Sequence, residues 1–184
     1  MLFRSGITIG VIVTGVMLFA GLIITIIINS LLAPTKKTPQ TVIPEIIELM
    51  NLNKNDKFLD LGCGVGDIVL EAYRNSQCKC FGYDISPIMI IIARTKRILH
   101  FPMSKDIVFE GENLFELKFN NFTKIYCYLD DKTMNALKGK IMEYVKNGGV
   151  LYSYKYGIDG LKSEKKIKLS DNEYLYIYGE LKKD

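Results

Sequence analysis

Two residue types are scarce enough to exclude whole classes of site. The chain has one histidine, His100, and four cysteines, none of them spaced as CxxC. Structural zinc sites need four nitrogen or sulfur ligands at characteristic spacings. The sequence therefore gives no support for a metal centre. The cysteines are expected to be reduced core thiols, and they are Cys63, Cys78, Cys80 and Cys127.

Charge is missing from one long stretch, because no Asp, Glu, Lys or Arg lies between Ser5 and Thr35. The apolar run 7–28 has about 22 residues, which as a helix would span roughly 33 Å, close to a bilayer core. We therefore predict a single transmembrane anchor in 1–35 and a second domain in 36–184. A cleaved signal peptide and a buried core helix are the alternatives.

The flanking charges bear on orientation and on partners. Arg4 precedes the apolar run, whereas Lys36, Lys37 and a lysine-rich domain follow it, which favours a cytoplasmic side for that domain. The formal net charge of +4 is modest. A protein that binds nucleic acid would be expected to carry a clustered basic face. A nucleic-acid partner is therefore not expected.

Beyond residue 40, apolar runs and helical patterns alternate in the manner of a parallel α/β sheet. Five strands are predicted at 58–61, 78–85, 107–112, 124–129 and 150–156, and a hairpin at 165–169 and 174–181. Helices are predicted at about 42–50, 67–75, 87–99 and 132–146. The fold class is therefore α/β, a Rossmann-like seven-stranded mostly parallel sheet with an antiparallel C-terminal hairpin.

A glycine-rich turn follows the first predicted strand. Residues 58–66 read FLDLGCGVG, and a helical pattern begins at Asp67. The next strand ends at a second acid, Asp84. Strand, glycine turn, helix, strand and acid together predict a nucleoside site at the carboxyl ends of the strands.

The acids around this turn distinguish between nucleosides. Dinucleotide sites use GxGxxG to set a pyrophosphate on a helix N-terminus, whereas here the spacing is GxGxG and Asp67 stands where a phosphate would lie. Asp60 precedes the turn and suits a positively charged ligand. S-adenosylmethionine carries a sulfonium and an ammonium but no phosphate, and Asp84 can accept both of its ribose hydroxyls. Another nucleotide, or a purely structural turn, are the alternatives.

These residues resemble the class I (seven-β-strand) S-adenosylmethionine-dependent methyltransferases over about 38–184. A narrower resemblance, to the membrane-anchored protein-lysine methyltransferases, is carried by Thr38-Pro39, DLG at 60–62, GYDISP at 82–87 and Tyr128-Leu129. Where relatives have proline after that last pair, this chain has Asp130. The resemblance implies that Thr38 and its neighbours fold over the methionine end of the cofactor.

Candidate site residues follow from the motif and the resemblance. The predicted cofactor-binding residues are Thr38, Asp60, Gly62, Cys63, Gly64, Gly66, Asp84, Ile85, Asn113, Leu114 and Tyr128. Asn113 is expected to pair with adenine. The predicted catalytic residues are Tyr128, Asp130 and Asp131, because an aromatic edge and a carboxylate suit an ammonium acceptor. Sheet packing for Tyr128, and helix capping for one of the two acids, are the alternatives.

The sequence thus predicts an enzyme that transfers a methyl group from S-adenosylmethionine. The favoured acceptor is a lysine side chain of a membrane or membrane-proximal protein. The alternatives are a lipid, a quinone or another small membrane-associated molecule, and a cofactor-binding protein without activity, which the departure at Asp130 motivates. The signature N/D-P-P-Y of amide and base-nitrogen methyltransferases is absent.

Overall fold

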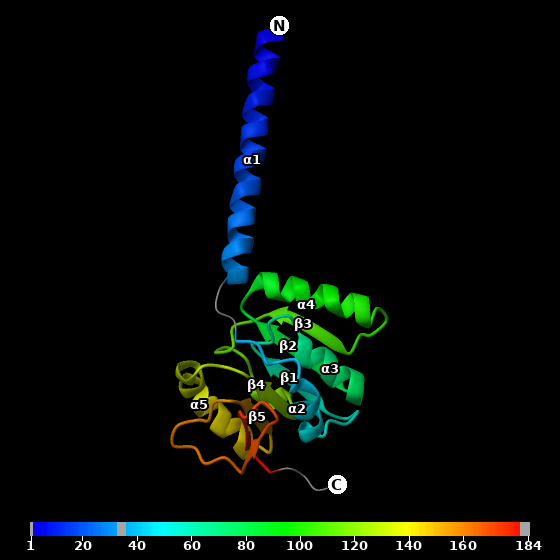
Figure 1. Ribbon diagram of the computed structural model, residues 1–184, viewed down its shortest axis with the longest axis vertical. Coiled ribbons are helices and arrows are strands. Elements are labelled where there is room, and N and C mark those ends of the chain that lie inside the picture. The colour runs from blue at the N-terminus through cyan, green and yellow to red at the C-terminus, as the bar shows by residue number, and fades with distance from the viewer. Residues whose placement is uncertain (1, 33–35, 181–184) are drawn as a thin grey trace. The chain divides into compact units, whose positions relative to one another are not determined.

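The computed structural model describes the backbone of residues 2–32 and 36–180, and the side chains of residues 10–25 and 36–180 (Figure 1). The chain divides into two compact units, Met1–Thr35 and Lys36–Asp184. The two units are described separately below.

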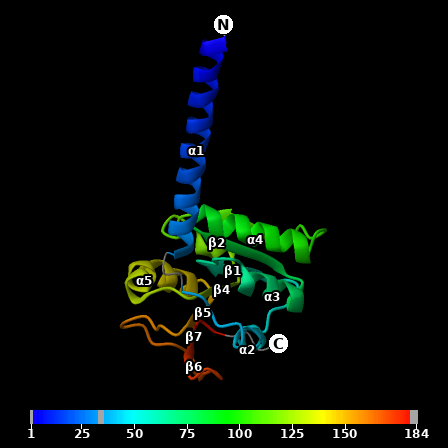
Figure 2. The ribbon, with the colours of Figure 1, turned by 45° about the horizontal axis from the view of Figure 1, so that its top comes forward.

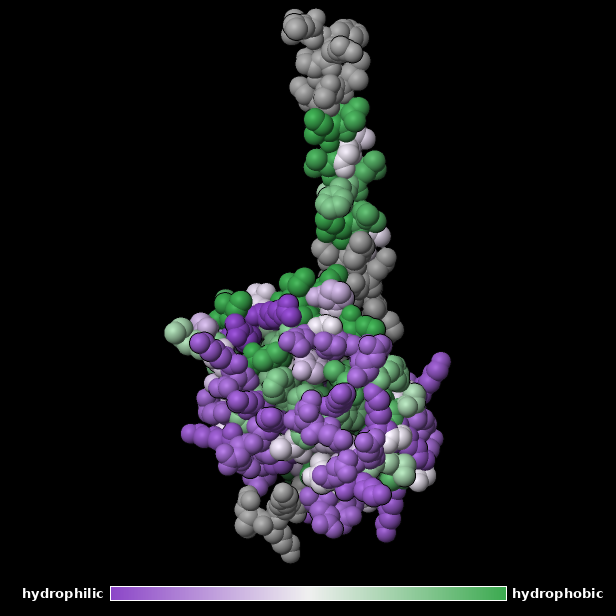
Figure 3. Space-filling model, turned by 180° about the vertical axis from the view of Figure 1, so that it is seen from behind, coloured by the Kyte–Doolittle hydropathy of each residue, from purple (hydrophilic) through white to green (hydrophobic). Residues whose placement is uncertain are grey.

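The first unit is one helix, α1 (Leu2–Leu32). Its described apolar side chains are exposed, from Ile23 at 41% to Met17 and Leu18 at 71%. Figure 3 shows green, hydrophobic atoms over most of the described part of this helix. Among the residues that the structure describes, no helix combines the length and apolar character needed to cross a membrane. The predicted span 7–28 is therefore not confirmed, and 7–9 and 26–28 lie outside the described side chains.

The second unit is built on a seven-stranded sheet in the order β3-β2-β1-β4-β5-β7-β6. The first five strands run parallel, and β7 joins β5 antiparallel and pairs with β6 in a hairpin. The strands are β1 (Lys57–Leu61), β2 (Lys79–Asp84), β3 (Ile107–Gly111), β4 (Lys124–Cys127), β5 (Val150–Tyr154), β6 (Lys165–Lys168) and β7 (Tyr174–Tyr178).

Helices cover both faces of this sheet (Figures 1 and 2). Three helices pack in one apolar cluster with the first face, and they are α2 (Ile43–Met50), α3 (Asp67–Ser76) and α4 (Pro87–His100). A second apolar cluster joins the other face to α5 (Asp131–Lys146) and the short η1 (Phe119–Asn121). The central strand β1 is buried from Phe58 to Leu61, as expected for a parallel strand covered on both sides.

The predicted fold class is confirmed in strand number, strand directions and the terminal hairpin. Six of the seven strands, all but β1, are shorter than predicted; among them, β4 ends at Cys127 and β5 at Tyr154. Lys155 adopts a left-handed conformation with φ of 70°, which turns the chain out of the ladder. Tyr128 and Tyr156 therefore lie in the loops at the carboxyl edge rather than within strands.

Candidate functional site

The glycine turn lies where the strand order reverses, between β1 and β4, which is the usual ligand position in such sheets. Gly62, Gly64 and Gly66 all have positive φ, of 76°, 51° and 83°. A Cβ at Gly66 would stand 2.6 Å from the Phe109 ring, whereas a Cβ at Gly64 would meet nothing within 4 Å. One glycine thus packs against the core, and another faces open space.

Asp84, at the end of β2, is fixed beside this turn. Its Oδ2 accepts a hydrogen bond from Gly64 N at 2.9 Å, and its Oδ1 accepts one from Ser86 N at 2.8 Å. A carboxylate has about four lone-pair sites, so acceptor capacity remains for two ligand hydroxyls. Asp84 is therefore fixed beside the turn with acceptor capacity to spare, and its ribose-binding role stays a prediction.

Asp60 is a buried acid that none of the described residues supplies with a hydrogen bond; its side chain is 3% exposed. Burial raises the pKa of its carboxyl well above the usual value, and the negative charges of Asp84 and Asp67 raise it further. A cation bound beside Asp60 would offset both effects. The turn is thus chemically matched to a positively charged ligand.

Asp67, the first residue of α3, is already paired. Its Oδ1 lies 2.5 Å from Lys96 Nζ, and its Oδ2 accepts a hydrogen bond from Gln40 Nε2 at 2.7 Å. The acid at the start of α3, where a dinucleotide fold would hold a phosphate, thus has its charge balanced by Lys96.

A segment before α2 crosses the carboxyl edge of the sheet, and we call residues 36–42 the strap. Thr38 Oγ1 and Tyr126 OH, on β4, lie 2.7 Å apart, and Gln40 reaches Asp67 beyond β1. Because Asp60 and Tyr126 are register partners, the strap passes beside the buried acid. Thr38 is therefore held at the row of the sheet that contains Asp60, and its predicted contact with the cofactor stays a prediction.

Three tyrosine rings gather at the carboxyl ends of β4 and β5, and we call Tyr128, Tyr154 and Tyr156 the tyrosine cluster. The ring centroids of Tyr128 and Tyr154 lie 4.8 Å apart, edge to face, and those of Tyr128 and Tyr156 lie 6.1 Å apart, stacked. The register Leu61↔Cys127 places Tyr128 one residue further on, level with Gly62.

The two predicted catalytic acids have different environments. Asp130 is the N-cap of α5, and its carboxylate accepts hydrogen bonds from Thr133 N and Thr133 Oγ1, both at 3.0 Å. The bond from the Thr133 backbone is the main cause that lowers the pKa of Asp130, and the charge of Lys36 adds to it. Asp131, exposed in the first turn of α5, has no such role and remains available.

Other predicted site residues are less clearly placed. Asn113, beyond β3, donates to Glu116 Oε1 at 2.9 Å and accepts from Phe115 N at 3.1 Å, so an adenine would have to displace local bonds. Leu114 packs against the core on the α5 side of the sheet. Ile85, next to Asp84, is 75% exposed. Their predicted roles remain predictions.

Cys63 lies in the turn, yet burial raises the pKa of its thiol, and the charges of Asp60 and Asp84 raise it further. A neutral, buried thiol is a poor nucleophile. All four cysteines are free and buried, as expected.

Sequence reasoning missed several residues that complete this edge. Tyr126 and Gln40 hold the strap, and Lys96 pairs with Asp67. The period-2 spacing of Tyr126 with Tyr128 and of Tyr152 with Tyr154 was the available signal, since these residues share one face once the strands are aligned.

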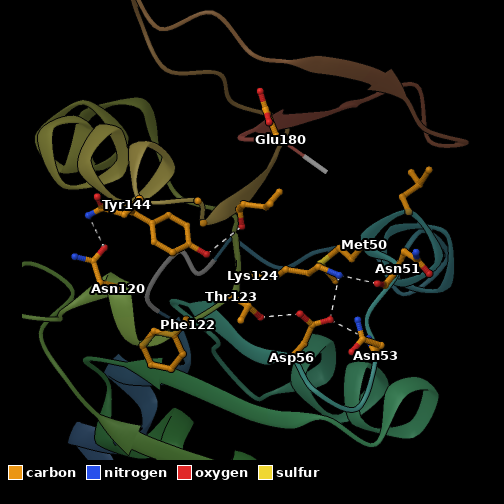
Figure 4. Close-up of a pocket in the computed structure, with 15 residues that line it drawn as sticks. Met50, Asn51, Asn53, Asp56, Asn120, Phe122, Thr123, Lys124, Tyr144 and Glu180 are labelled. Carbon is orange, nitrogen blue, oxygen red and sulfur yellow. Dashed lines mark hydrogen bonds and ion pairs between the residues drawn. The ribbon is translucent and has the colours of Figure 1, made fainter. Parts of the chain in front are cut away.

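A cavity of about 400 Å³ lies at the opposite edge, at the amino ends of β1, β4 and β5 (Figure 4). Its polar groups are mutually paired. Asp56 accepts from Lys124 Nζ at 3.1 Å and from Thr123 Oγ1 at 2.7 Å, and Lys124 also donates to Asn51 O. This cluster ties loops together and is remote from the glycine turn.

The residues at the carboxyl edge fit S-adenosylmethionine. The open space beside Gly64 gives room for the ligand, and the Asp84 carboxylate could accept hydrogen bonds from the ribose hydroxyls. The buried Asp60 carboxyl could balance the positive charge of the methionine end. When bound, this group supplies an electrophilic methyl on a sulfonium.

Comparisons with known proteins bear on the family of this chain. A sequence model of the ANTKMT methyltransferase domain matches residues 60–165. A protein-lysine N-methyltransferase of Saccharolobus islandicus (strain REY15A) is 27% identical over 155 residues, covering 81% of this chain and 96% of that protein. A type I restriction enzyme MjaVII methylase subunit of Methanocaldococcus jannaschii is 30% identical over 84 residues, covering 42% of this chain and 15% of that protein.

Solved structures share the fold. An RNA methyltransferase from Salinibacter ruber, in complex with S-adenosyl-L-homocysteine, has a TM-score of 0.71 at 24% identity and covers 81% of this chain and 98% of its own. Magnesium protoporphyrin IX methyltransferase from Synechocystis PCC 6803, with bound S-adenosylmethionine, has a TM-score of 0.56 at 17% identity, covering 75% and 74%.

The family match spans more than half of the chain and includes both the glycine turn and the tyrosine cluster. The predicted cofactor and reaction class are confirmed: the chain belongs to the ANTKMT methyltransferase domain family and is a class I S-adenosylmethionine-dependent methyltransferase.

Proposed function

We propose that this enzyme methylates a lysine side chain of a protein in or near a membrane. The carrying observation is the tyrosine cluster beside Gly62, with Asp130 in the same loop as Tyr128. Aromatic faces and a carboxylate attract an ammonium group. The similar protein of Saccharolobus islandicus carries the name protein-lysine N-methyltransferase, which supports the same acceptor.

In this proposal the chain's own residues position the acceptor rather than activate it chemically. A reacting nitrogen must approach the methyl group to about 3–3.5 Å and in line with the bond that breaks. Tyr128 lies level with Gly62 and so borders the place where the two would meet. Asp130, whose pKa is lowered, stays ionised near neutral pH and attracts the ammonium, and the acceptor proton leaves to water.

Membrane tethering is the second part of the proposal. It is supported by the uncharged sequence from Ser5 to Thr35 and by the exposed apolar side chains of α1. On this proposal the catalytic domain lies on the cytoplasmic side, where the cofactor is made. A tether raises the effective concentration of targets in the same bilayer.

The test uses the full-length protein in detergent, membranes and S-adenosylmethionine labelled in its methyl group. After extraction with organic solvent, label should remain in protein, and hydrolysis should yield methylated lysine. Asp84→Ala is the matched control and should transfer no label. Label found only in the organic phase would identify a lipid or quinone acceptor and reject the lysine acceptor. Label in added RNA alone would reject it too.

A further inference from the structure

A lysine of the chain itself already stands in the tyrosine cluster. Lys36 Nζ lies 4.0 Å from the centroid of the Tyr156 ring, well within the range of a cation–π contact. Its positive charge is also one of the causes that lower the pKa of Asp130. Lys36 thus has the surroundings that the proposed function assigns to an acceptor lysine.

The backbone is arranged to bring the two groups together. Lys155, which precedes Tyr156, has φ of 70°, an unfavourable conformation for a residue with a side chain. This turn in the backbone places the Tyr156 ring against that of Tyr128. Ser153 Oγ then donates to Tyr156 O at 2.6 Å and fixes the turn. Strained residues that the surroundings hold in place are concentrated at functional sites.

From the lysine side, the strap provides the fixed point. Thr38, two residues after Lys36, is bonded to Tyr126 in the row of the sheet that contains Asp60. The first residue of the strap is therefore only two residues from a fixed contact on β4. Tethering of this kind makes an encounter intramolecular, with a high effective concentration.

We propose that Lys36 is a methylation site of this protein, modified in cis while its side chain is held by the tyrosine cluster. The inference rests on the proposed lysine acceptor and deepens it by naming one substrate. The neutral Nζ lone pair forms the new bond to the methyl carbon. The carbon–sulfur bond breaks, its electron pair stays on sulfur, and S-adenosylhomocysteine departs. The proton of Nζ goes to water, because Lys36 is exposed.

The test combines mapping of the modification with a spectroscopic measurement that needs no turnover. The full-length protein is incubated with S-adenosylmethionine carrying a deuterated methyl group, and peptides are analysed by mass spectrometry. Label is expected at Lys36 and not at the adjacent Lys37. The fraction labelled per unit time should not change when the protein is diluted, because the reaction is intramolecular.

Variants at Tyr156 separate the aromatic contact from the fold. Tyr156→Leu should slow labelling of Lys36 about three- to fivefold, the loss of one cation–π contact, whereas Tyr156→Phe should retain the rate. In the cofactor-free protein, the ε-methylene protons of Lys36 should show an upfield ring-current shift in NMR spectra. The shift should persist in Tyr156→Phe and disappear in Tyr156→Leu.

The outcomes distinguish this inference from the proposed function. Methylated lysines in added membrane proteins with Lys36 unmodified would overturn the inference and leave the function standing. Label only in lipid would overturn both. Labelling of Lys36 that slows on dilution, or the absence of a ring-current shift, would overturn the cis geometry. Lys37→Arg should change none of these readouts, and a loss of Lys36 labelling in it would also count against the proposal.

Discussion

A methyl group placed at Gly64 should block the cofactor while leaving the fold almost intact. Gly64 has φ of 51°, and a Cβ there would meet no atom within 4 Å. Alanine in the left-handed region costs about 1–2 kcal/mol. Restricting the unfolded chain offsets about 0.4–1 kcal/mol of this cost. The free energy of unfolding should therefore fall by only about 1 kcal/mol in Gly64→Ala.

Gly66→Ala is the contrasting variant. Its φ of 83° carries the same backbone cost, but the new Cβ would also stand 2.6 Å from Phe109 Cζ and 3.2 Å from the Ala93 Cβ. Overpacking of this kind costs about 1–3 kcal/mol more. Gly148→Ala is the matched control, because Gly148 has φ of 87° and open space around it but lies at the end of α5.

Two measurements test the contrast. Chemical denaturation gives the free energy of unfolding, and calorimetry gives the affinity for S-adenosylhomocysteine, the stable product. Gly64→Ala should lose at least about tenfold in affinity, about 1.4 kcal/mol, while Gly148→Ala binds as the wild type does. Wild-type affinity in Gly64→Ala would show that the ligand does not lie over this glycine. A loss of stability equal to that of Gly66→Ala would show that the space above Gly64 is filled by protein.

Further expectations concern the acids and the strap. In Asp84→Ala, calorimetry should detect no cofactor binding, because the carboxylate that fixes Gly64 N and would accept the ribose hydroxyls is gone. Since the pKa of Asp60 is raised, the wild-type affinity for S-adenosylmethionine should rise with pH, by up to about tenfold per pH unit below that pKa, whereas Asp60→Asn should bind weakly and lack this dependence. The raised pKa of Asp60 also makes the stability of the cofactor-free protein depend on pH. The contribution of Asp60 to the free energy of unfolding is fully present below the unfolded-state pKa, about 3.9, and is lost as the pH rises through the folded-state pKa. In Asp60→Asn, the free energy of unfolding measured across that range should not show this loss. In Tyr126→Phe, loss of the 2.7 Å bond to Thr38 should cost about 1 kcal/mol and speed amide hydrogen exchange in residues 38–42, and unchanged exchange there would mean that this bond does not hold the strap.

The sheet and the cofactor edge were predictable because their signals are local. The run before Asp60, the glycine spacing and the acid at Asp84 each follow from a strand that ends in a turn, and such ends meet at one edge of a parallel sheet. The N-cap of α5 was also predictable in kind. The sequence did not indicate which of Asp130 and Asp131 caps the helix, because a shift of one residue in the start of the helix changes the answer. Helix boundaries are the least certain part of any sequence pattern.

The strap shows where local signals end. Two prolines and several polar residues in 33–40 are typical of a linker, and nothing in that composition indicates a bond to Tyr126, 88 residues away. The contact exists because the connection from β3 to β4 returns the chain to pair with β1, which places Tyr126 beside Asp60 in the row that Thr38 contacts. Likewise, the three tyrosines at 152, 154 and 156 have the spacing of one strand face, but the left-handed Lys155 takes Tyr156 out of the strand and gives it a cation to contact. The cofactor half of the site therefore follows from short-range pattern, whereas the acceptor half depends on contacts that only the strand order creates. That division explains why the sequence predicts the methyl donor more firmly than the acceptor.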